Sequence, residues 1–191
     1  MTKLKPVFVC LALFTIFISA CTGLNSYRYR QMYALVKPVE NYDRFYEDDK
    51  VAFRFEVEEK KIHLFVTNKS KRDIRLDWPD VRFIDPDGKK HQVANLDTIF
   101  TNNTGRIKPT AVSAGMTEEN LIVPLDNMTN IEQWTWMLKP FFNQEDDRAL
   151  LNKNKTFSIT FPVELDENER RSYRFDFKVT NVIAYRGRNP G

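Results

Sequence analysis

The sequence predicts an all-β fold, an antiparallel sandwich of seven to nine strands. Three observations favour this fold. Apolar and polar residues alternate with a period of two over many short segments. Clusters of turn-forming residues separate these segments at short spacing. Long apolar patterns with a helical period are few. The chain has 191 residues and 42% apolar content, which suits a single globular domain rather than a disordered chain.

The first clear strands lie in residues 51–67. One face of the first segment is apolar and consists of Val51, Phe53, Phe55 and Val57. The positions between them hold Ala52, Arg54, Glu56 and Glu58. This pattern predicts a half-buried strand. The pair Glu59-Lys60 predicts a tight turn, and residues 62–67 (IHLFVT) predict the partner strand of a hairpin.

The middle of the chain predicts more hairpins. Residues 74–78 alternate again, and Pro79 ends that strand because proline cannot donate to a ladder. The run Asp85-Pro86-Asp87-Gly88 joins strands at 81–85 and 89–94, since proline early and glycine late favour a turn. A further strand is expected at 117–123, before Pro124.

The C-terminal half predicts two long strands, at residues 156–165 and 172–183, joined by the polar loop at 166–169. Apolar residues alternate regularly along one face of the second strand, at Tyr173, Phe175, Phe177 and Val179. Residues 95–116 and 124–154 are expected to be irregular.

Residues 1–20 have the layout of a secretory signal peptide. Lys3 and Lys5 make the start positive, and residues 7–18 form an apolar run of twelve. This run is shorter than the roughly 18 residues that span a bilayer, but it matches the apolar core of a signal peptide. Two small residues follow, and then Cys21.

The tetrad Ile18-Ser19-Ala20-Cys21 resembles the lipobox of bacterial lipoproteins. In that family the cysteine thiol is alkylated with diacylglycerol, the leader is cut before the cysteine, and the new amino group is often acylated, for example with palmitate. The resemblance implies that Cys21 is the lipidated first residue of the mature chain. Several acyl chains anchor a protein durably, whereas one does so only marginally. The alternatives are an ordinary cleaved signal and an uncleaved anchor.

The lipobox also bears on location and on disulfides. Since Thr22 rather than Asp follows the cysteine, the resemblance favours the outer membrane if the host is Gram-negative. Cys10 leaves with the leader and Cys21 carries lipid, so the mature domain has no cysteine for a disulfide or a cysteine-based zinc site.

The expected domains are a signal peptide at 1–20, a lipid anchor and tether at 21–44, and a β-sandwich at 45–186. A basic and aromatic stretch follows the anchor, and its candidate membrane-interface residues are Tyr27, Arg28, Tyr29 and Arg30. The alternative is that this stretch is a first strand packed on the domain.

The middle of the chain resembles a group of uncharacterised bacterial lipoproteins with an immunoglobulin-like sandwich. The resemblance covers about residues 50–180 and rests on Trp78, on Phe83-Ile84-Asp85, on Asp87-Gly88 and on His91. It implies an immunoglobulin-like fold and brings no catalytic residues with it.

Composition and motifs favour a protein that is not an enzyme. The whole chain has 29 Lys+Arg and 26 Asp+Glu, and two of the lysines lie in the leader. The mature chain therefore lacks the basic excess that binds nucleic acid. His63 and His91 are expected to be structural, as are the turn at 85–88 and the acidic cluster Glu145-Asp146-Asp147. No catalytic residue, metal site or cofactor is expected.

Residues 134–142 (WTWMLKPFF) hold the candidate partner-contact residues. Large aromatic side chains concentrate at protein interfaces and are costly to leave in water. The candidates are Trp134, Trp136, Phe141 and Phe142. The alternative is that this segment closes the core.

The sequence therefore favours a lipid-anchored cell-envelope protein whose domain contacts another envelope protein or a glycan. The membrane contact would be made by the lipid on Cys21. A second hypothesis is a surface-exposed, adhesin-like lipoprotein that binds a host or glycan ligand.

Overall fold

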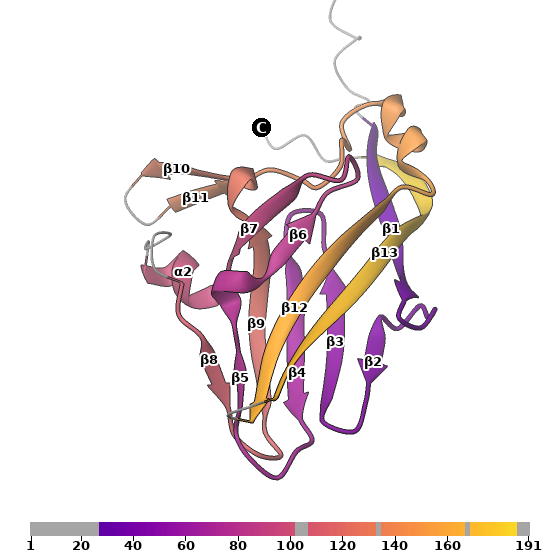
Figure 1. Cartoon of the computed structure of the whole chain (residues 1–191). Helices are drawn as coiled ribbons and strands as arrows, with labels where there is room; N and C mark the ends of the chain where they lie inside the picture. The colour runs from indigo at the N-terminus through magenta and orange to yellow at the C-terminus, as the bar shows by residue number, and fades with distance from the viewer. Residues whose placement is uncertain (1–26, 102–106, 133–134, 167–168, 187–191) are drawn as a thin grey trace, which may run out of the picture.

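The structure is a computed structural model, and it describes residues 27–101, 107–132, 135–166 and 169–186. The described chain is all-β, with antiparallel strands throughout, as the sequence predicts. Two layers of strands face each other across one core (Figure 1). The expected signal peptide and Cys21 lie outside the described residues.

The first layer is centred on two long strands. In order along the layer it comprises β1 (Tyr27–Lys37), β13 (Glu169–Arg186) and β12 (Thr156–Asp166), with β6 (Arg82–Ile84) and β5 (Ile74–Leu76) both beside β12, and β8 (Thr110–Val112) beside β5. The second layer comprises β2 (Phe45–Glu47), β3 (Val51–Val57), β4 (Ile62–Asn68) and β9 (Thr117–Pro124). β7 (Lys90–Ala94) pairs with both β6 and β9, and so joins the layers along one side.

Shorter elements lie around this sandwich. They are the helix α2 (Leu96–Thr101), the hairpin strands β10 (Met128–Glu132) and β11 (Thr135–Leu138), and the 3-10 helices η1 (Trp78–Asp80), η2 (Leu125–Asn127) and η3 (Asp147–Asn152). The described residues form thirteen strands, more than the seven to nine expected. Four of the thirteen have only three residues each. A strand that short is too brief to show a period in the sequence.

Aromatic rings from the two layers meet in the core. Phe55 of β3 lies 4.7 Å from Phe175 and 5.1 Å from Phe177 of β13, measured between ring centroids. Trp78, at the start of η1, packs edge-on against Phe161 of β12 at 5.1 Å. These rings are almost completely buried. The alternating faces predicted for β3 and β13 therefore do point into one core.

The side of the sandwich opposite β7 is closed by the connection between β1 and β2. The Arg44 guanidinium donates to the carbonyl of Tyr33 in β1 at 3.1 Å and to the carbonyl of Phe55 in β3 at 3.2 Å. Tyr33 lies in the edge strand β1, and Phe55 lies just beyond the part of β3 that pairs with β2, so both carbonyls would otherwise lack a partner strand. One side chain thus links the two edges.

The folded domain begins earlier than the expected boundary at residue 45. β1 lies within residues 21–44, which the sequence assigned to the anchor and tether, and it pairs with β13 from Tyr27 to Lys37. The alternative reading of this stretch, a first strand packed on the domain, describes the structure.

Candidate functional site

The candidate membrane-interface residues lie at one end of the molecule. Tyr27, Arg28, Tyr29 and Arg30 form the first part of β1 and pair with Ile183 to Arg186 of β13. The pairing of β12 with β13 stops at Lys178, so β1 and β13 continue beyond it as a two-stranded ribbon. We call residues 27–32 and 181–186 the terminal ribbon. Of the four candidate residues, Tyr27, Arg28 and Arg30 are exposed and Tyr29 is half-buried.

The 3-10 helix η3 packs against the terminal ribbon (Figure 1). The Tyr29 amide donates to the Gln144 carbonyl at 3.0 Å, and the side-chain amides of Gln31 and Gln144 meet at 2.8 Å. Asp146 caps the start of η3, since its carboxylate accepts from the Arg148 amide at 3.0 Å. The acidic cluster therefore lies at the start of a helix, which is a structural role.

The aromatic segment at 134–142 divides between core and surface. Trp134 lies outside the described residues. Phe142 is 5% exposed, and Phe141 stacks on Phe83 at 5.2 Å, so both help to close the core. Trp136 is half-buried on β11. Closure of the core, the alternative that the sequence left open, therefore describes the two phenylalanines.

The hairpin β10–β11 forms a two-stranded sheet of its own in the described part of the chain. Two apolar side chains project from it into solvent, Ile131 at 57% and Met137 at 47% exposure. Sequence reasoning did not single out this pair, because neither residue is aromatic. Both residues are candidates for a protein contact, because they are apolar, exposed and on one short hairpin.

His91 bridges two carboxylates. Its Nε2 lies 2.8 Å from Asp85 Oδ2 and its Nδ1 lies 2.8 Å from Asp126 Oδ2. The first contact reaches the turn between β6 and β7, where Gly88 has φ +82° and its amide donates to the Asp85 carbonyl. The second contact reaches η2. Burial would raise the pKa of Asp85, but hydrogen bonds from His91 and from the Lys89 and Asp87 amides outweigh it and lower that pKa.

Replacement of His91 with alanine is expected to lower the free energy of unfolding by about 1–3 kcal/mol. The change would leave two carboxylates facing each other without the ring between them. Urea titration measures the loss. The matched control is His63→Ala, because His63 lies 2.9 Å from Glu58 on a more exposed face and should cost less than about 1 kcal/mol. An equal loss in both variants would contradict the bridging role.

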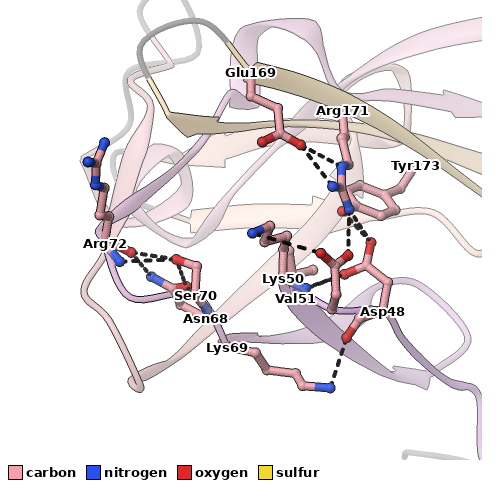
Figure 2. Close-up of polar contacts among 11 residues, drawn as sticks. Asp48, Lys50, Val51, Asn68, Lys69, Ser70, Arg72, Glu169, Arg171 and Tyr173 are labelled. Atoms are coloured by element: carbon pink, nitrogen blue, oxygen red, sulfur yellow. Dashed lines mark hydrogen bonds and ion pairs between the residues drawn. The ribbon is translucent and has the colours of Figure 1, made fainter.

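The end of the molecule opposite the terminal ribbon carries a dense polar network (Figure 2). Asp48, in the turn between β2 and β3, accepts from Tyr173 Oη at 2.8 Å and from Arg171 Nη1 at 3.1 Å. Arg171 also pairs with Asp49 at 2.9 Å and Glu169 at 2.8 Å. Burial and the hydrogen bond to Asp48 raise the pKa of Tyr173.

A surface pocket of about 450 Å³ lies beside this network. Its charged lining is mostly basic: Lys50, Lys69, Lys71 and Arg72, against Asp49 and Glu169. Lys69 is held by Glu47 at 2.8 Å, and Lys50 lies 3.8 Å from Asp49. Part of the positive charge is therefore balanced inside the domain.

A larger pocket of about 660 Å³ lies between the edge of β1 and the turn that joins β3 to β4. Arg30 and Arg44 line it on one side and Glu58 and Glu59 on the other. Near it, the Tyr33 hydroxyl is buried and has no hydrogen-bond partner among the described residues. Burial and the charge of Glu59 raise the pKa of Tyr33.

Among the residues that the structure describes, no helix has the length and apolar character needed to cross a membrane. In the same ranges, no group of three or more His, Cys, Asp or Glu side chains is placed to hold a metal ion. A scan against models of protein families finds no match for this chain, and a search of curated proteins finds none either.

Proposed function

We propose that this protein is a lipid-anchored component of a bacterial cell envelope, whose β-sandwich binds another envelope component without catalysing a reaction. One observation carries the proposal: only five residues separate the lipobox cysteine, Cys21, from Tyr27, the first described residue and the start of β1. A chain of five residues cannot extend beyond about 20 Å. A lipid on Cys21 would therefore hold the domain close to the membrane surface.

Both histidines contact carboxylates within the domain. His91 links a turn to η2, and His63 lies beside carboxylates on the outer face of β4. These contacts give both side chains a structural role.

The surface that best fits a protein partner is the β10–β11 hairpin, where Ile131 and Met137 are exposed and Trp136 is half-buried.

The anchor is tested by replacing Cys21 with serine. The thioether to diacylglycerol cannot form on serine, so the variant should move from the membrane pellet to the soluble fraction after a carbonate wash. Metabolic labelling with a fatty acid should mark the native chain and not the variant. A Cys21→Ser protein that stays in the washed membranes would overturn the lipid anchor.

Partner binding is tested by crosslinking in the native cell, followed by affinity purification. A double variant, Ile131→Ser with Met137→Ser, should lose an envelope partner that the native chain retains. Met116→Ser is the matched control, because Met116 is 60% exposed but lies beside the β4–β5 loop, away from the hairpin. Retention of the same partner by the double variant would argue against the hairpin as the contact surface.

A further inference from the structure

The terminal ribbon and η3 together form the end of the domain nearest the proposed lipid. β1 begins there, and β13 ends there after 18 residues, a length on the order of 60 Å at the usual rise of a strand. The network around Asp48 lies at the other end of β13 (Figures 1 and 2). Of the two ends of the long axis, only the end with the terminal ribbon therefore lies next to residues 22–26, which join Cys21 to β1.

Several large apolar side chains are exposed at this end. Leu150 and Leu151 of η3 are 52% and 73% exposed, although the neighbouring Ala149 is fully buried. On the ribbon, Tyr27 and Ile183 are each 46% exposed. Isolated exposed apolar residues need no explanation, but several gathered at one end indicate a contact with an apolar partner.

The charge of the ribbon is uniformly positive. Residues 27–32 (YRYRQM) and 181–186 (NVIAYR) contain three arginines and no acidic residue, and Arg28, Arg30 and Arg186 are all exposed. Arg30 lies 5.7 Å from the centre of the Tyr185 ring, so it is held over the ribbon surface. The adjoining segment 145–155 is neutral, since three acidic and three basic side chains balance. These three segments together therefore have three more basic than acidic side chains.

We infer that this end docks on the surface of a bilayer that contains anionic lipid. Leu150 and Leu151 enter the boundary between headgroups and acyl chains, Tyr27 and Tyr185 lie at headgroup level, and the three arginines contact lipid phosphates. The inference rests on the proposed lipid on Cys21, which brings this end within reach. It adds a defined orientation: the β2–β3 and β4–β5 turns point away from the membrane.

A single spin label tests the docking. Cys21 is alkylated in the mature chain and Cys10 is removed, so a cysteine in place of Leu151 is the only free thiol. The lipidated protein is reconstituted into vesicles of phosphatidylcholine with one quarter phosphatidylglycerol. The ratio of collisions with oxygen to collisions with a water-soluble nickel chelate should be severalfold higher at position 151 than at position 71, where Lys71→Cys provides an exposed control at the far end.

Removing two of the three positive charges of the terminal ribbon is the second part of the test. In the Leu151→Cys background, Arg28→Gln with Arg30→Gln should return the label to the aqueous ratio while the protein still floats with the vesicles. Vesicles of phosphatidylcholine alone should have the same effect. Protein that floats but carries a label as water-accessible as that at position 71 would overturn the docking alone. Protein that fails to float would overturn the lipid anchor, and the docking with it.

Discussion

Replacement of Phe175 with alanine is expected to lower the free energy of unfolding by about 3–5 kcal/mol. Phe175 is fully buried at the centre of the contact between layers, 4.9 Å from Phe53 and 4.7 Å from Phe55 between ring centroids. Truncation removes the ring from both partners and leaves a cavity that a sandwich can fill only in part. Urea titration of the mature chain carrying Cys21→Ser measures the loss.

This loss is large for a domain whose described residues contain no disulfide bond. Both cysteines of the chain, Cys10 and Cys21, precede the described residues, and domains of this size are usually stable by only about 5–15 kcal/mol. Phe175→Leu keeps most of the volume and should cost about 1 kcal/mol. Phe100→Ala, at a side chain that is 71% exposed, should change stability by less than about 0.5 kcal/mol. Similar losses for Phe175→Ala and Phe100→Ala would contradict the packing described for the core.

The regular hairpins were predictable because each carries its own period and its own turn. Alternation predicts β3 and β4, and their register places Phe53 opposite Val66 and Phe55 opposite Leu64 on the core face. The turn at Asp85 was predictable from its residues alone, since the Asp85 carboxylate accepts from the Asp87 and Lys89 amides, both at 2.9 Å. Local chemistry fixes these elements.

β1 was harder to identify, because its inward positions are large and partly polar. Tyr29, Gln31 and Tyr33 share the face that η3 and the core cover, and they alternate with exposed Arg28 and Arg30. That alternation was present in the sequence. The position beside the lipobox and the basic aromatic composition favoured a tether instead, and only pairing with β13 distinguishes the two.

The contacts that tie distant segments together have no signature in the sequence. Asp48 and Tyr173 are 125 residues apart, and Asp126 is 35 residues from His91. Neither pair belongs to one hairpin, so no spacing rule brings them together. The sequence predicted a structural role for His91 but could not supply its partners. For the same reason, the apolar end formed by η3 and the terminal ribbon appears only once the strands are paired.

Replacement of Asp48 with asparagine is expected to lower the free energy of unfolding by about 2–4 kcal/mol at pH 7. The Asp48 carboxylate accepts from the Lys50 and Val51 amides at 2.8 and 2.9 Å, and also from Arg171 and Tyr173 (Figure 2). An asparagine side chain can still accept from the two amides. Its NH₂ group, however, faces the Arg171 donor, and the negative charge that holds the guanidinium is lost.

The same contacts set how stability depends on pH. Burial would raise the pKa of Asp48, but hydrogen bonds from the two amides, Tyr173 and Arg171 outweigh it, so this pKa is lowered in the folded state. The folded protein therefore binds a proton at Asp48 less readily than the unfolded chain does. The stabilisation is complete above the unfolded pKa of about 4 and is lost as pH falls through the lower folded value.

Urea titrations from pH 7 down to about pH 2 separate this contribution from general acid denaturation. Asp48→Asn should flatten the decline in stability below about pH 4, because the group that gains the proton is absent. Asp87→Asn is the matched control: Asp87 is exposed at a turn, and its loss should leave both the stability at pH 7 and the acid slope within about 0.5 kcal/mol of the native chain. If the two variants have the same acid slope, the turn between β2 and β3 is not held to β13 through the charge of Asp48.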